Sequence, residues 1–179
     1  MGTVLVTVDA FQEKKYASEI TDLLLIRGVK STYQIFDKYP GVIVFRSDEV
    51  NSIDLSKIML SIAHVRRIVK SVVPLVWSSY GEFRSYEDIA VLIIEDFLPR
   101  IDIEMFNSKK VVVRCRFRGL KGEHRVEMIV GAYLKRLVNF KVSFEDPDYL
   151  ILIEQVGELC GVYVGHPDKN ILMYRPYTC

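Results

Sequence analysis

The sequence has few residues of the kinds that build metal sites and disulfide frameworks. Its 179 residues contain only three cysteines and three histidines. The cysteines, Cys115, Cys160 and Cys179, lie far apart and form no C-x-x-C pair, which argues against both a disulfide framework and a zinc ribbon. The histidines form no H-x-H or H-E-x-x-H pattern. We therefore expect no bound metal ion and a reduced, cytoplasmic protein.

Long apolar segments and an excess of one charge are also absent. No apolar run approaches the ~18–20 residues that a membrane-spanning helix needs, so we expect no membrane association. Residues 1–6 lack the basic region and apolar stretch of a secretory signal. With 24 basic and 23 acidic residues, the net charge of +1 gives no overall attraction to nucleic acid. Any such attraction has to come from local clustering of charge.

Sequence motifs of catalysis are missing as well. There is no G-x-G-x-x-G, no Walker sequence and no G-x-S-x-G. Cys115 is expected on the buried face of a strand and Cys160 in a glycine-flanked turn, so structural roles are favoured for both. Asp146 and Asp148 flank a proline, which is far more common in turns than in catalytic pairs. These absences predict a protein that is not an enzyme and that has no cofactor.

The segment 1–76 alternates between strand-like and helix-like patterns. Val4, Val6 and Val8 alternate with Leu5 and Thr7, as in a strand, and apolar residues recur at helical spacing from residue 14 to residue 27. The turn at residues 39–41, Tyr-Pro-Gly, predicts an antiparallel hairpin. The expected elements are strands at 4–8, 29–36, 42–45 and 67–73, the last ended by Pro74, and helices at 14–27 and 52–63. This order predicts a ferredoxin-like βαββαβ domain at residues 1–76.

Residues 77–85 interrupt the periodicity and are expected to form a packed linker. Ser85 and Asp88 then approximate a capping box for a helix that ends before Pro99. The elements expected after it are strands at 109–118, 142–144, 149–153 and 159–164 and a helix at 123–138. The pattern predicts a second domain at residues 86–166, with helices packed on a mixed sheet, and an irregular tail at residues 167–179. The expected fold class is α/β (α+β).

Charge is strongly segregated in the second half. Residues 109–141 contain ten basic residues and only two acidic ones, a net charge of +8. Residues 142–161 contain five acidic residues and no basic one, a net charge of −5. The ten basic residues are Lys109, Lys110, Arg114, Arg116, Arg118, Lys121, Arg125, Lys135, Arg136 and Lys141. A basic segment of this kind is typical of proteins that bind nucleic acid.

Three arginines alternate with apolar residues at the end of the strand expected at 109–118. Arg114, Arg116 and Arg118 are expected on one face, about 7 Å apart in succession, while Val113, Cys115 and their neighbours face the core. This spacing matches successive phosphates of a nucleic-acid strand, and binding of this kind weakens steeply with salt. The alternative is that the acidic residues of 142–161 pair with these arginines.

The second half resembles a THUMP domain. The resemblance rests on the arginine-bearing strand at 110–118 and on Val-Gly-Ala-Tyr-Leu at 130–134 in the helix that follows. It extends to residues 141–154, where a short strand leads through a Pro-Asp turn into an apolar strand that ends in an acid. In all it covers roughly residues 80–166, and THUMP domains are commonly preceded by a ferredoxin-like domain.

The resemblance implies that the two domains together bind the acceptor region of tRNA and serve its modification. In most members a catalytic domain follows, whereas one branch lacks such a domain and presents tRNA to a separate cytidine acetyltransferase. The sequence is similar to this branch in length and layout, and in residues 4–9 and 39–41. We therefore expect a non-catalytic tRNA-binding adaptor, with an acetyltransferase as partner and acetylcytidine as the product.

The resemblance also assigns RNA contacts to four positions, Arg114, Arg116, Arg118 and Arg125. Charge and expected position add Lys109, Lys110, Lys121, His124, Lys135 and Arg136. Gly131 in mid-helix costs about 1 kcal/mol relative to alanine, which predicts a close neighbour there, either sheet or RNA. Two other functions remain open: a stand-alone RNA-modifying enzyme that uses Cys160 or a histidine, and a protein-docking module that uses the basic strand.

Overall fold

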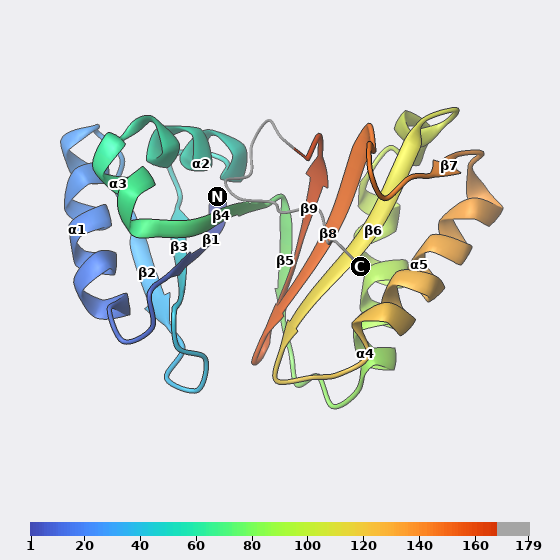
Figure 1. Ribbon diagram of the computed structural model, residues 1–179, viewed down its shortest axis with the longest axis horizontal. Helices are drawn as coiled ribbons and strands as arrows, with labels where there is room; N and C mark the ends of the chain where they lie inside the picture. Colours follow the sequence, from blue (N-terminus) through green and yellow to red (C-terminus); the bar gives the residue numbers. More distant parts are fainter. Residues whose placement is uncertain (168–179) are drawn as a thin grey trace. The chain divides into compact units, whose positions relative to one another are not determined.

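The computed structural model describes residues 1–167, which form two compact units, Met1–Val76 and Trp77–Pro167. Each unit is one β-sheet with helices packed on it (Figure 1). The α+β fold class expected from the sequence is confirmed. The tail expected at residues 167–179 lies, from residue 168 onward, outside the described residues.

The first unit is a four-stranded antiparallel sheet with strand order β2-β3-β1-β4. Its elements are β1 (Gly2–Val8), α1 (Glu13–Ile26), β2 (Thr32–Ile35), β3 (Val42–Ser47), α2 (Ser52–Ser61), α3 (Ala63–Ile68) and β4 (Val69–Leu75). With α2 and α3 in place of a single second helix, this is the βαββαβ order of a ferredoxin-like unit.

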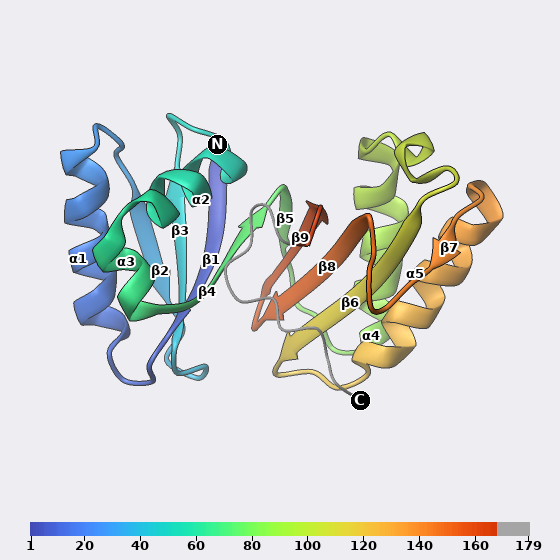
Figure 2. The ribbon, with the colours of Figure 1, turned by 45° about the horizontal axis from the view of Figure 1, so that its top comes forward.

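The helices of the first unit lie beside its four strands in Figure 2. Val4 and Val6 of β1 belong to the same buried cluster as Ile20 of α1 and Met59 of α2. Side chains two residues apart on a strand point to the same face, so the alternation in the sequence brings these valines against the helices.

Strand β4 differs from the expectation at both ends. It begins at Val69, because residues 63–68 form α3, and it continues through Pro74, which lies opposite Val4. Pro74 was expected to end the strand because proline has no N–H to donate. In this sheet β4 is an edge strand, where a proline is tolerated because no further strand needs its N–H.

The second unit is a mixed five-stranded sheet with strand order β5-β9-β8-β6-β7, in which β6 runs parallel to β7 and β8. Its strands are β5 (Trp77–Tyr80), β6 (Lys110–Arg118), β7 (Lys141–Val142), β8 (Tyr149–Val156) and β9 (Leu159–Gly165). Its helices are α4 (Tyr86–Leu92) and α5 (Glu123–Leu137). Helix α4 continues into a π-helical segment (Ile93–Phe97) and a 3₁₀ turn (Leu98–Arg100), and a separate 3₁₀ turn (Ile103–Phe106) follows. The capping box expected at Ser85 and Asp88 is present.

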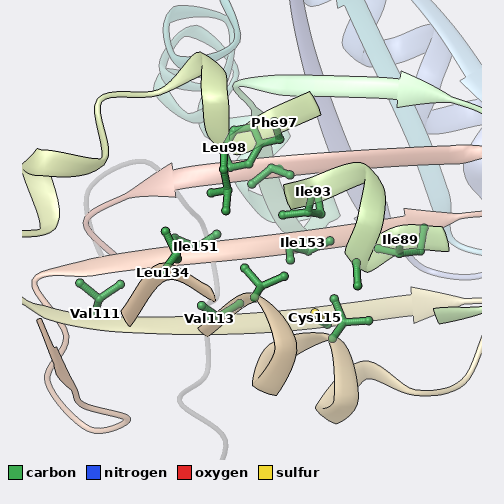
Figure 3. Packing of buried hydrophobic residues seen from close by; sticks show 14 of the residues in the cluster. Ile89, Ile93, Phe97, Leu98, Val111, Val113, Cys115, Leu134, Ile151 and Ile153 are labelled. Atoms are coloured by element: carbon green, nitrogen blue, oxygen red, sulfur yellow. The ribbon is translucent and has the colours of Figure 1, made fainter. Parts of the chain in front are cut away.

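Buried residues of both helices and of the sheet form the core of the second unit (Figure 3). Three residues of β6 that alternate in sequence, Val111, Val113 and Cys115, all point into this cluster. Leu134 of α5 and Ile93 beyond α4 pack against them. One face of β6 is therefore apolar and covered by helices, as its alternation predicts, and the residues between must project from the other face.

Residues 77–80, expected in a linker, instead form β5, which pairs antiparallel with β9. The ring of Trp77 lies 5.6 Å from that of Phe97, so the segment is anchored by an aromatic contact as well as by the strand ladder. Two consecutive serines at 78 and 79 concealed this short strand.

Candidate nucleic-acid interface

The arginines of β6 lie on the face expected for them, but they are largely covered. The side chains of Arg114, Arg116 and Arg118 are 14%, 21% and 27% exposed. A ladder of three open guanidinium groups is therefore not what the strand presents. Each of the three is held by an acidic residue of a neighbouring element.

Glu154 of β8 holds two of these arginines. Parallel pairing places Glu154 directly beside Arg116, and its carboxylate accepts from Arg116 Nη1 at 3.4 Å and from Arg118 Nη1 at 3.0 Å. The Glu154 side chain is only 1% exposed. Burial raises the pKa of this carboxyl group, and the two guanidinium groups act in the opposite direction. The two arginines thus compensate a buried acid, and any RNA contact they make has to use the remaining N–H groups.

Arg114 is held differently, between an aromatic ring and a carboxylate. Its guanidinium carbon lies 4.7 Å from the centroid of the Phe144 ring, and its Nη1 lies 3.7 Å from Glu127 of α5. Glu127 also accepts a hydrogen bond of 2.9 Å from the backbone N–H of Cys115. Glu127 therefore fixes Arg114 and satisfies a donor of β6 at the same time.

The loop between β6 and α5 and the helix itself carry most of the exposed basic residues. Lys121, His124, Arg125, Lys135 and Arg136 are all exposed. Arg125 donates from Nη1 to the hydroxyl of Tyr86 at 2.8 Å, with its guanidinium 5.2 Å from the centre of that ring. His124 Nδ1 lies 3.7 Å from Glu127.

The two lysines at the start of β6 are exposed, and one of them is paired. Lys110 Nζ donates to Asp146 at 2.8 Å, and this hydrogen bond raises the pKa of Lys110 and lowers that of Asp146. The backbone N–H of Lys110 donates to Asp148 at 2.8 Å. Asp146 and Asp148 therefore fix the turn before β8, and Lys109 stays exposed beside it.

Sequence reasoning missed three residues of this surface: Glu127, Phe144 and Tyr86. The alternative that acidic residues of 142–161 pair with the arginines is confirmed for Arg116 and Arg118, which both bind Glu154. A sequence signal marks Glu154, because it is the single acid among the mostly apolar residues of 149–156. Gly131, which was expected to admit a close neighbour, faces open space, since a Cβ atom built there meets nothing within 4 Å. The sheet is thus not the reason for this glycine.

Both described cysteines are buried thiols, and Cys160 lies in β9 rather than in the turn expected for it. Burial raises the pKa of Cys160 to about 12, and it also raises the pKa of Cys115, to which Glu127 adds. A neutral, buried thiol is a poor nucleophile, so Cys160 is not suited to the catalytic role considered for it. Within residues 1–167, no three His, Cys, Asp or Glu side chains lie together as metal ligands, and no helix has the length and apolar character to cross a membrane.

No protein-family model matches the sequence, and no curated protein matches it either. Solved structures do match. PH1313 from Pyrococcus horikoshii Ot3 is 17% identical over 92% of this chain and 54% of its own, with a TM-score of 0.61. TrmN from Thermus thermophilus is 16% identical over 97% of this chain and 46% of its own, with a TM-score of 0.62. SMU.472, a putative methyltransferase complexed with SAH, is 14% identical over 92% and 42%, with a TM-score of 0.51.

These structures include THUMP-domain proteins. At identities of 14–17% the comparison shows the fold alone. The fold is THUMP-like. The chain spans about half of the length of the structures it matches.

The same comparison corrects one expectation. A protein that is not an enzyme was predicted from the missing motifs, whereas the structures that share this fold include SMU.472, a putative methyltransferase that was solved with SAH. The motifs that are missing are all short local patterns. Their absence does not exclude catalytic residues that lie far apart in the sequence.

Proposed function

We propose that the protein binds tRNA through the basic surface of residues 109–141 and takes part in tRNA modification. The observation that carries this proposal is the group of exposed basic residues in this segment, among them Lys109, Lys121, Arg125, Lys135 and Arg136, in a segment of net charge +8 within a chain whose total charge is +1. The THUMP-like fold supports it, because the resemblance links this fold to proteins that act on tRNA. Shape and phosphate positions, rather than base sequence, would select the RNA.

Exposed residues of the basic surface make the main phosphate contacts. Lys121, His124 and Arg125 lie at the start of α5, and Lys135 and Arg136 in its last turns. Lys109 and Lys110 contribute from the start of β6, while Arg116 and Arg118 contribute through the N–H groups that Glu154 leaves available. Each neutralised phosphate releases condensed counterions, so affinity depends on salt.

Two kinds of tRNA modification are candidates. The resemblance to the acetylation branch favours cytidine acetylation with a separate acetyltransferase as partner. The similarity to SMU.472, which was solved with SAH, makes methylation the second candidate. The cytoplasmic location stays a prediction.

Binding of deacylated tRNA across a salt series tests the first part. Changing Lys135 and Arg136 together to alanine is expected to weaken binding and to lower the log–log salt slope by about 1.5, the value for two lost contacts. The control changes Arg84 and Arg100, two exposed arginines of the same unit outside residues 109–141, and should leave the slope unchanged. A wild-type protein that ignores tRNA at low salt would overturn the proposal in favour of protein docking.

Deletion of the gene, followed by mass spectrometry of tRNA nucleosides, tests the chemistry. Loss of acetylcytidine supports acetylation, and loss of a methylated nucleoside supports methylation. An unchanged nucleoside profile contradicts a role in modification even if tRNA binding is found.

A further inference from the structure

Phe144 is an exposed aromatic residue on a rigid support. Its side chain is 55% exposed, although it lies in the turn between β7 and β8, inside the second unit. Four hydrogen bonds fix this turn: Ser143 N–H to Val111 O at 3.3 Å, Asp146 N–H to Ser143 Oγ at 3.3 Å, and the two bonds of 2.8 Å that join Lys110 and Asp148. An apolar ring held this firmly in solvent serves better as a binding surface than a mobile one, because little side-chain entropy is lost on contact.

One side of the Phe144 ring is already covered. The Arg114 guanidinium lies 4.7 Å from the ring centroid and is itself held by Glu127. Arg114 is 14% exposed, so it supports the ring more than it reaches outward. A cation over one face of an aromatic ring fixes the orientation of that ring and leaves the opposite face as the one a partner can meet.

The surroundings of Phe144 favour a flat, uncharged partner. Glu145 and Asp146 follow it directly in the turn and are both exposed; Lys110 pairs with Asp146, and Glu145 disfavours a phosphate directly beside the ring. Bases of nucleic acid have a neutral π-face, and unpaired bases of RNA stack on exposed aromatic side chains. The basic surface of residues 109–141 would hold the backbone of the same RNA.

We propose that Phe144 is a stacking site for an unpaired nucleobase of RNA and that Arg114 is a positioning residue for its ring. This inference rests on the proposed function and adds a contact to a base, in addition to the contacts with phosphates. It also changes the role of Arg114 from a phosphate contact to a support.

The test compares binding of single-stranded and blunt duplex RNA oligonucleotides by the full chain. Changing Phe144 to alanine is expected to lower affinity for the single strand roughly 5- to 150-fold, the range that base stacking supports, with an unchanged salt slope and little effect on the duplex. Changing Phe11 to alanine is the matched control, because this phenylalanine is 84% exposed in the other unit. Equal losses in both variants would overturn the assignment.

A second variant, Phe144→Trp, gives a readout that does not depend on lost binding. The chain has a single tryptophan, Trp77, so the added fluorescence is obtained by difference. Single-stranded RNA is expected to quench it, and Arg114→Met in the same background is expected to reduce the quenching without changing the salt slope. If RNA binds but neither quenches the added tryptophan nor responds to Phe144→Ala, the stacking site is overturned and only this inference fails. If the wild type binds no RNA, the proposed function fails with it.

Discussion

Arg118 of β6 donates to Glu154 of β8 at 3.0 Å, and the carboxylate that receives this bond is almost completely buried. The contact joins two strands that run parallel and adjacent in the sheet. Arg116 reaches the same carboxylate at 3.4 Å. A buried charge is tolerated only when it is paired, so the two arginines have a structural task in addition to any contact with RNA.

Removing both arginines should therefore destabilise the protein as well as weaken RNA binding. Changing Arg116 and Arg118 together to methionine leaves Glu154 buried without a partner, and a loss of about 3–5 kcal/mol in the free energy of unfolding is expected. Urea denaturation at pH 7 measures it. Adding Glu154→Leu to the double variant removes the orphan charge and should restore most of the stability.

The pH dependence of the double variant provides a control on this reading. Without its arginines, the pKa of Glu154 in the folded protein rises further above the unfolded value, and stability is then lost as the pH increases through that range. The deficit is thus expected to shrink as the pH falls toward 5. A double variant as stable as the wild type at pH 7 would contradict the structural role of the pair.

The sequence predicted the faces of β6 correctly and offered pairing with the acidic residues of 142–161 as an alternative, but it did not predict which acid lies beside the arginines. Alternation is a property of one strand, and it places Val113 and Cys115 in the core and Arg114 and Arg116 on the other face. The parallel register with β8, which brings Glu154 to Arg116, depends on contacts between segments far apart in sequence. The alternation of residues within one strand cannot predict this register.

Short and edge elements were missed for a related reason. Strand β5 is short and owes its position to β9, which is the last strand of the same sheet to appear along the chain. Pro74 lies inside a strand because β4 is at the sheet edge, and edge position follows from the assembled sheet. The Arg114–Phe144 contact likewise joins β6 to a turn that follows only after the whole of α5.

Glu13 should make the first unit sensitive to acid. Burial raises the pKa of Glu13, but hydrogen bonds from the backbone N–H groups of Gly41, Glu13 and Phe11 outweigh burial and hold the pKa below its ordinary value. A depressed folded-state pKa contributes stability above the unfolded pKa of about 4.3, and this contribution is lost as the pH falls through the folded value. Denaturation followed from pH 7 to pH 3 should show the loss.

The variant Glu13→Gln isolates this contribution. It is expected to cost about 1–3 kcal/mol at pH 7, because hydrogen bonds to a charged acceptor become neutral ones, and to flatten the pH dependence below pH 5. Asp22→Asn, an exposed carboxylate on the same helix, is the matched control and should change neither. Parallel pH curves for Glu13→Gln and the wild type would exclude the effect.

Two glycines of the second unit should respond to alanine with opposite signs. Gly122 has a φ of 111°, and a Cβ atom there would lie 2.7 Å from Cδ1 of Tyr86, so Gly122→Ala is expected to cost about 1–3 kcal/mol and to disturb the Tyr86–Arg125 contact. Gly131 lies inside α5, where its Cβ would meet nothing within 4 Å. Gly131→Ala is therefore expected to stabilise the protein by up to about 1 kcal/mol. Thermal unfolding measures both, and a destabilised Gly131→Ala variant would reveal a contact that the structure does not have.

The buried thiols should resist modification while the protein is folded. With a pKa of about 12, the Cys160 thiol is ionised in only about one molecule in ten thousand at pH 8, and burial and Glu127 raise the pKa of Cys115 as well. Treatment with a maleimide, followed by peptide mass spectrometry at these two positions, should show slow labelling in buffer and complete labelling in urea. Rapid native labelling of Cys160 would mean that this thiol is accessible and ionised, and it would restore the cysteine-dependent chemistry that the buried position argues against.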